Sequence, residues 1–167
     1  MSAPYKTETR EIDGKEYRID FFQDEDMGPP WKEHDGHGPV TDWTTRDKHP
    51  GELILNKDSG SRRYYNFAEA CKIALRDGWD SKPYNTDGSQ TPRQQAAKAA
   101  LADFERLLAW CIDAWHWCGV VVTERRTDSD GYSYDGPSES LWGIESDAGE
   151  YFETVIGELI AELKAGA

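Results

Sequence analysis

The pattern of apolar and polar residues changes period near Trp115, and this change organises the prediction for the whole chain. Upstream of it, apolar residues recur at intervals of three and four, which places them on one face of a helix. They are Ala97, Ala100, Leu101, Phe104, Leu107, Leu108, Cys111 and Trp115. Thr91 and Gln94 supply a capping box at the start of this helix. From Trp115 to Val122 the period is two and both faces are apolar, which predicts a strand in the centre of a sheet, covered by helix on at least one side.

Turn and cap signals delimit the other predicted elements. Asp13-Gly14 lies between two alternating runs, Tyr5–Ile12 and Lys15–Asp24, and predicts a hairpin with a type I′ turn. The further elements are a short hairpin (51–56 and 62–65), a helix from the Asn66 cap to Gly78, a loop at 127–138, a strand at 139–145 and a final helix capped by Ser146 or Asp147. The fold class that follows is α+β: a mostly antiparallel sheet with about three helices packed on it, in a single domain over residues 1–167.

Two segments carry no periodic pattern. Residues 27–50 contain four prolines and three of the four histidines, and Trp31 and Trp43 can anchor them as a long ordered loop. Loops of this length in compact domains are often functional. Residues 80–90 form a polar, turn-rich connection, which we expect to be mobile.

The formal charge of −13 is concentrated in the last part of the chain, where residues 101–167 carry 4 basic and 14 acidic side chains. Direct nucleic-acid binding needs a basic footprint and is not expected, whereas basic partners such as nucleic-acid-binding proteins are favoured. Tryptophan is common at interface hot spots. The candidate partner-binding residues are Asp128, Asp130, Asp135, Glu150, Glu153, Glu158, Glu162, Trp31 and Trp43. The alternative is that the charge only keeps the protein soluble.

The segment Glu33-His34-Asp35-Gly36-His37 is the best candidate for a metal site, with His34, Asp35 and His37 as ligands. Sets of histidine and carboxylate suit zinc, iron or manganese. The spacing matches no standard template, and the glycines equally fit a tight turn whose histidines bond to the backbone.

Other chemical signals favour binding over catalysis. No P-loop, dinucleotide-binding fingerprint or GxSxG motif is present, so we assign no catalytic residues and no cofactor. Cys111 and Cys118 lie in apolar patterns beside His116, where inert core thiols are favoured over a nucleophile. Arg62-Arg63-Tyr64-Tyr65 could stack bases or clamp phosphate, but pairing of its arginines with the acidic C-terminal third is favoured.

The compartment is predicted from what the chain lacks. The first twenty residues contain no apolar segment of the signal-peptide kind. No apolar run approaches the roughly 20 residues that span a bilayer. Three cysteines in apolar patterns suit a reducing environment. We therefore expect a cytoplasmic protein with no membrane association.

Four blocks of the sequence resemble a family of small proteins from phage and prophage genomes. The blocks cover Trp31–Trp43, Gly60–Trp79, Trp110–Val122 and Glu139–Tyr151, and read WKEHDGHGPVTDW, GSRRYYNFAEACKIALRDGW, WCIDAWHWCGVVV and ESLWGIESDAGEY. The function of this family is not known, so the resemblance implies a phage accessory protein in a bacterial cytoplasm and supplies no catalytic residues.

Two functional hypotheses follow from these observations. The first is a non-enzymatic protein whose acidic surface binds a host protein, a nucleic-acid-handling or defence factor, in the manner of a DNA mimic. The second is a small metal-dependent enzyme or metal-binding domain that uses the loop from His34 to His49.

Overall fold

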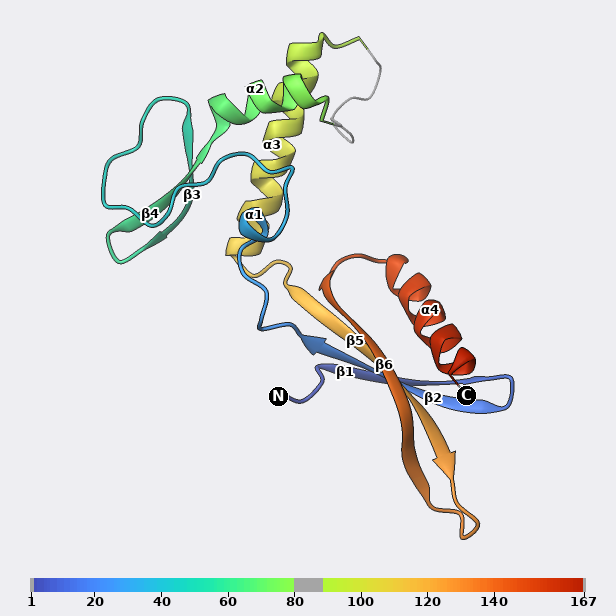
Figure 1. Ribbon diagram of the computed structural model, residues 1–167. Coiled ribbons are helices and arrows are strands. Elements are labelled where there is room, and N and C mark those ends of the chain that lie inside the picture. Colours follow the sequence, from blue (N-terminus) through green and yellow to red (C-terminus); the bar gives the residue numbers. More distant parts are fainter. Residues whose placement is uncertain (1, 80–88, 167) are drawn as a thin grey trace. The chain divides into compact units, whose positions relative to one another are not determined.

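A computed structural model describes residues 2–79 and 89–166. The chain divides into two compact units. The terminal unit comprises Met1–Met27 and Trp115–Ala167, and the central unit comprises Gly28–Ala114. Four helices and two antiparallel sheets lie in the described residues, so the predicted α+β class is confirmed (Figure 1). The prediction of one domain over residues 1–167 stays a prediction.

The terminal unit is built on a four-stranded antiparallel sheet. Its strands are β1 (Lys6–Ile12), β2 (Lys15–Gln23), β5 (Trp117–Thr127) and β6 (Ser133–Glu145), in the order β1-β2-β5-β6. Asp13 and Gly14 join β1 to β2 with φ values of 54° and 78°, both positive as a type I′ turn requires. The predicted hairpin and the central position of β5 are therefore confirmed. Strand β6 begins at Ser133, inside the predicted loop, because its first residues pair with Thr127 and Arg126.

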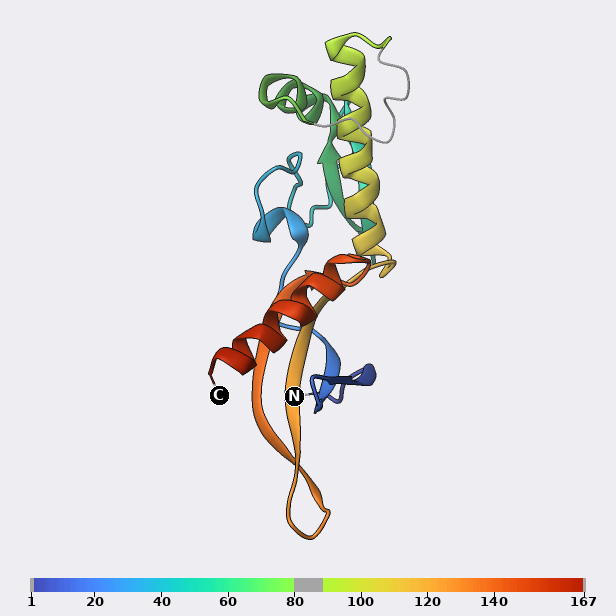
Figure 2. The same cartoon turned by 90° about the vertical axis from the view of Figure 1, so that its right-hand side faces the viewer.

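Helix α4 (Tyr151–Ala165) covers one face of this sheet, beside β5 and β6 (Figure 2). The core between them consists of Tyr17, Ile19, Phe21, Cys118, Val120, Val122, Ile144, Val155, Ile156, Leu159, Ile160 and Leu163. Helix α4 begins after Glu150, not after a cap at Ser146 or Asp147. The Ser146 hydroxyl instead accepts a hydrogen bond from the His116 backbone (2.9 Å), which ties the end of β6 to the start of β5.

The central unit combines a two-stranded sheet with three helices. Strands β3 (Glu52–Asp58) and β4 (Ser61–Asn66) form the predicted second hairpin, and α1 (Pro30–Glu33), α2 (Phe67–Asp77) and α3 (Pro92–Cys111) accompany it. The caps are as predicted. The Asn66 side chain accepts from Glu69, and Thr91 and Gln94 form the capping box. The polar connection at 80–90 falls largely outside the described residues, which omit 80–88.

One expectation about the helices was wrong. Helix α3 ends at Cys111, not at Trp115, because Asp113 adopts a left-handed backbone conformation (φ 59°) that a helix cannot continue through. Of the described helices, α4 belongs to the unit that contains the four-stranded sheet, and α1, α2 and α3 belong to the unit that contains the two-stranded sheet. Trp115 is 2% exposed, as predicted for a residue at the entry to the central strand.

Candidate binding surface

Nearly all of the net charge belongs to the terminal unit. Its sequence contains 7 basic and 19 acidic side chains, a net charge of −12. The central unit contains 12 basic and 13 acidic side chains, a net charge of −1. The electrostatic potentials of the two units therefore attract different partners, and only the terminal unit strongly attracts positively charged ones.

The basic side chains of the terminal unit are already occupied by its own carboxylates. Each of the seven lies within 4 Å of an acidic partner. The pairs are Lys6–Glu8, Arg10–Glu8, Arg10–Glu153, Lys15–Glu124, Arg126–Glu124, Arg18–Asp20, Arg18–Asp135, Arg125–Asp135 and Lys164–Asp13. These pairs involve six acidic residues of the unit, namely Glu8, Asp13, Asp20, Glu124, Asp135 and Glu153. The negative charge of this unit thus exceeds what its own cations neutralise.

The ion pairs divide the predicted acidic partner-binding residues into two groups. Asp135 is held by Arg18 and Arg125, and Glu153 by both terminal nitrogens of Arg10 (2.7 and 2.8 Å). These guanidinium groups keep the pKa of both carboxyls below the usual range. Asp135 and Glu153 are therefore paired within the unit and offer little free charge. The remaining five, Asp128, Asp130, Glu150, Glu158 and Glu162, are exposed and take part in none of these ion pairs.

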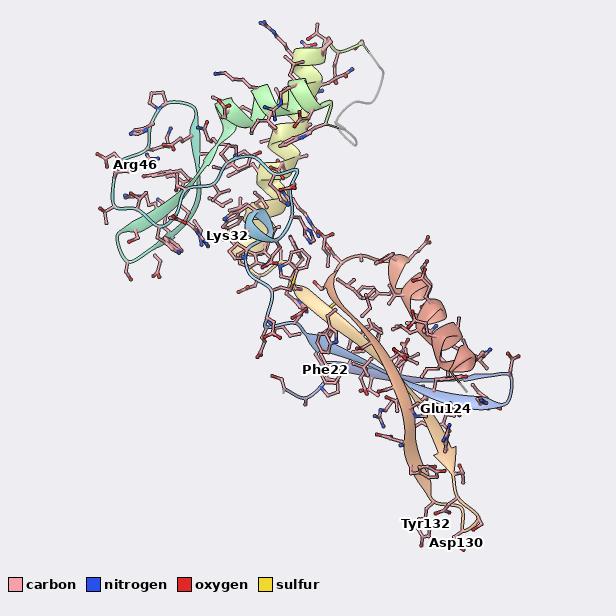
Figure 3. The ribbon with its side chains drawn as sticks, viewed as in Figure 1. Phe22, Lys32, Arg46, Glu124, Asp130 and Tyr132 are labelled. Atoms are coloured by element: carbon pink, nitrogen blue, oxygen red, sulfur yellow. The ribbon has the colours of Figure 1, made fainter. Side chains whose placement is uncertain are left out.

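The turn between β5 and β6 presents an ordered, exposed tip. The Asp128 carboxylate accepts hydrogen bonds from the backbone nitrogens of Asp130 and Tyr132, both at 2.9 Å, and the Gly131 nitrogen donates to the Asp128 carbonyl. Tyr132 is 74% exposed beside Asp130 (Figure 3). Strand β2 pairs with β5 only as far as Arg125, so the tip lies beyond the four-stranded part of the sheet. These hydrogen bonds fix the backbone that carries an exposed aromatic ring and a carboxylate, so little conformational entropy remains to be lost if the tip is bound.

The face of the sheet opposite α4 carries an aromatic pair that the sequence did not single out. Phe22 of β2 and Trp142 of β6 lie with ring centroids 5.8 Å apart. Both flank Gly119 of β5, and the indole occupies the space that a side chain there would fill. A glycine inside a strand pattern is the signal that could have revealed this close approach.

The predicted metal ligands are not brought together. His34 and Asp35 are exposed, whereas His37 Nδ1 is 2.6 Å from Oδ1 of Asp103 on α3. The other Asp103 oxygen accepts from the Gly38 nitrogen (2.7 Å) and the Tyr65 hydroxyl (2.8 Å). Within residues 2–79 and 89–166, no group of three or more His, Cys, Asp or Glu side chains is placed to hold a metal ion. The histidine bonds a carboxylate rather than the backbone, and fastens the loop to α3.

Trp31 and Trp43 enclose an arginine. The Arg63 guanidinium lies 4.8 Å from the Trp31 ring and 4.5 Å from the Trp43 ring, and its Nε donates to Asn56 (2.8 Å). Cation–π contacts within the central unit thus engage Arg63, and the pairing of Arg62 and Arg63 with the acidic C-terminal third stays a prediction. Trp43 remains 43% exposed, so one face of this cluster is accessible.

Neither of the two cysteines considered has the character of a nucleophile. Burial raises the pKa of the Cys111 and Cys118 thiols, which is the opposite of the shift that activates a catalytic cysteine. His116 packs edge-on against Tyr5, with ring centroids 5.4 Å apart. Neither thiol therefore shows the lowered pKa of a catalytic nucleophile.

Comparison with known proteins yields no match among protein families, curated proteins or solved structures. The resemblance to phage accessory proteins stays a prediction. None of the helices in the described part of the chain combines the length and apolar character needed to cross a bilayer.

Proposed function

We propose that this protein is a phage-type accessory protein that binds a basic host protein through its terminal unit, and that its target is a nucleic-acid-handling or defence factor of the bacterial cytoplasm. The observation that carries the proposal is the separation of charge. The terminal unit has a net charge of −12, and each of its lysines and arginines is already paired. A partner with a basic surface would complement this net charge.

The exposed carboxylates lie on helix α4 and at the tip of the β5–β6 hairpin. Glu158 and Glu162 lie one turn apart on α4, and residues four apart share a helix face. Asp130 and Tyr132 stand at the ordered hairpin tip. A DNA-mimic form of the binding would use these free carboxylates in place of phosphates. Long-range charge of this kind mainly accelerates the encounter of two proteins, and ordered aromatic residues slow their separation.

The test reverses free carboxylates while leaving the ion pairs intact. Asp130, Glu158 and Glu162 are changed to lysine, which alters the net charge by +6. The matched control changes Asp35, Asp47 and Asp58, exposed residues of the central unit, to lysine, with the same alteration of net charge. Wild type and both variants are used to capture proteins from a bacterial lysate, and association with the captured protein is then timed by surface plasmon resonance.

We expect wild type and control to capture the same basic protein, and the Asp130/Glu158/Glu162 variant to associate with it at least tenfold more slowly. The association rate of the wild type should also fall as salt rises above the physiological range, because the Debye length is then below about 8 Å. Equal association rates for the two variants would refute the proposal, because the position of the charge would then be irrelevant.

A further inference from the structure

A pocket of about 520 Å³ opens beside the Phe22–Trp142 pair on the terminal unit. Its lining residues are Ser2, Phe22, Gln23, Asp24, Glu25, Asp26, Met27 and Trp142. Its volume falls within the range of about 300–1,000 Å³ that is typical of ligand sites. Three consecutive carboxylates thus border a cavity with two aromatic walls and a methionine.

The pocket is built by an irregularity in the sheet. Between Cys118 and Val120 the register of β5 with β6 shifts, and Gly143 adopts a positive φ of 73°. A bulge of this kind re-aims a side chain, and here Trp142 lies over Gly119. Asp24 fastens the bulge, since its Oδ2 accepts from the Gly143 nitrogen (3.0 Å). The wall of the pocket is therefore held in place before any ligand arrives.

The carboxylates above this wall differ in their availability. Asp24 is committed, because Oδ1 also accepts from the Asp26 nitrogen (3.1 Å). Glu25 and Asp26 are exposed and take part in none of the ion pairs of the unit, although the Ser2 hydroxyl donates to Glu25 (3.2 Å). Figure 3 places Phe22 at the end of β2, from which these residues follow directly along the chain. Two carboxylates that take part in none of these ion pairs therefore line the pocket together with two aromatic rings.

We infer that this pocket receives an arginine side chain of the basic partner, an inference that rests on the proposed function. A guanidinium stacks on aromatic faces and donates hydrogen bonds to carboxylates from a rigid, planar set of N–H groups. One arginine side chain can therefore contact the aromatic rings and the carboxylates of the pocket at the same time. A metal ion is disfavoured because these carboxylates do not form a ligand group. A phosphate is repelled by the same carboxylates.

The test follows the indole N–H signals of the seven tryptophans by two-dimensional ¹⁵N–¹H NMR, with the Trp142 signal assigned from Trp142→Phe. The probe is the peptide acetyl-Gly-Gly-Arg-Gly-Gly-amide, compared with versions that carry citrulline or lysine in place of arginine. Citrulline keeps the shape of arginine without its charge. A Glu25→Gln/Asp26→Asn variant removes the free carboxylates and keeps their volume. Asp47→Asn/Asp58→Asn, in the central unit, is its matched control.

We expect the arginine peptide to shift the Trp142 signal saturably, the citrulline peptide to leave it in place, and the lysine peptide to bind more weakly. The Glu25→Gln/Asp26→Asn variant should bind the arginine peptide at least fivefold more weakly than the control. An unmoved Trp142 signal, an equal shift with citrulline, or equal affinity of the two variants would overturn the assignment. If backbone amide signals of the hairpin tip (residues 128–132), recorded in the same spectra, move instead, the pocket is wrong while the acidic binding function survives. If the Trp142 signal does not respond and the capture experiment fails as well, both the arginine pocket and the proposed binding function are wrong.

Discussion

Substituting Gly119 by alanine should displace Trp142 and destabilise the terminal unit. A Cβ atom at Gly119 would lie 2.1, 2.4 and 2.6 Å from three carbons of the indole. Carbon atoms approach comfortably only to about 3.5 Å, so the ring must move by roughly 1.4 Å. Overpacking of this kind costs about 1–3 kcal/mol. The φ of Gly119 is not positive, so the steric conflict alone requires glycine here.

The free-energy cost of the steric conflict between a side chain at position 119 and Trp142 can be measured with a double-mutant cycle. Alanine in a strand interior is favoured over glycine by about 0.5–1 kcal/mol, so Gly119→Ala should be neutral or slightly stabilising once Trp142→Ala has removed the ring. The expected coupling free energy is therefore about 2 kcal/mol. The four proteins are unfolded in urea and followed by far-ultraviolet circular dichroism, which does not depend on the missing tryptophan.

The outcome that would refute the reasoning is additivity. If Gly119→Ala costs the same within about 0.5 kcal/mol with and without the indole, the two side chains do not compete for one space. The aromatic wall of the pocket would then be misplaced, and the arginine assignment would lose its basis.

Two further perturbations test the fold itself. Trp115→Ala should lower the free energy of unfolding by about 3–5 kcal/mol, because the indole is 2% exposed and packs edge-on against Trp117 (5.1 Å between centroids); a loss below about 1 kcal/mol in urea unfolding would contradict this. The Arg46 guanidinium lowers the pKa of Glu52 from 4.5 to about 2, so the ionised carboxylate contributes stability that is present above pH 4.5 and lost as the pH falls towards 2. Glu52→Gln should therefore lower the melting temperature at pH 7 and flatten its decline between pH 4.5 and 2, and an unchanged decline would show that other groups cause it.

Local signals in the sequence determined where most elements lie. The Asp13-Gly14 turn, the capping box at Thr91 and the caps of α2 depend on neighbouring residues alone, so a single sequence carries them. The change of period at Trp115 located the central strand for the same reason. The end of α3 was missed because the pattern contained no glycine or proline to mark it, and Asp113 takes the left-handed conformation in place of glycine.

The tertiary structure decided which side chains meet. Composition showed an acidic chain, but only the fold revealed that Arg10 and Arg18 neutralise Glu153 and Asp135 while other carboxylates remain free. Partners such as Arg10 and Glu153 are 143 residues apart in the chain. Their pairing depends on strand register, on the bulge in β6 and on the docking of α4, which no local pattern encodes.

The same distinction separates the predicted metal site from the aromatic pair that lines the pocket. His34, Asp35 and His37 were grouped because they are adjacent in sequence, yet the partner of His37 is Asp103, 66 residues away. Phe22 and Trp142 were not grouped, although Gly119 brings them together from two strands that do not pair with each other. The sequence alone determined the elements and the sign of the charge, because both follow from residue type and local spacing. The arrangement of charged and aromatic side chains on the surface is set only when long-range pairing has fixed the register of the sheet.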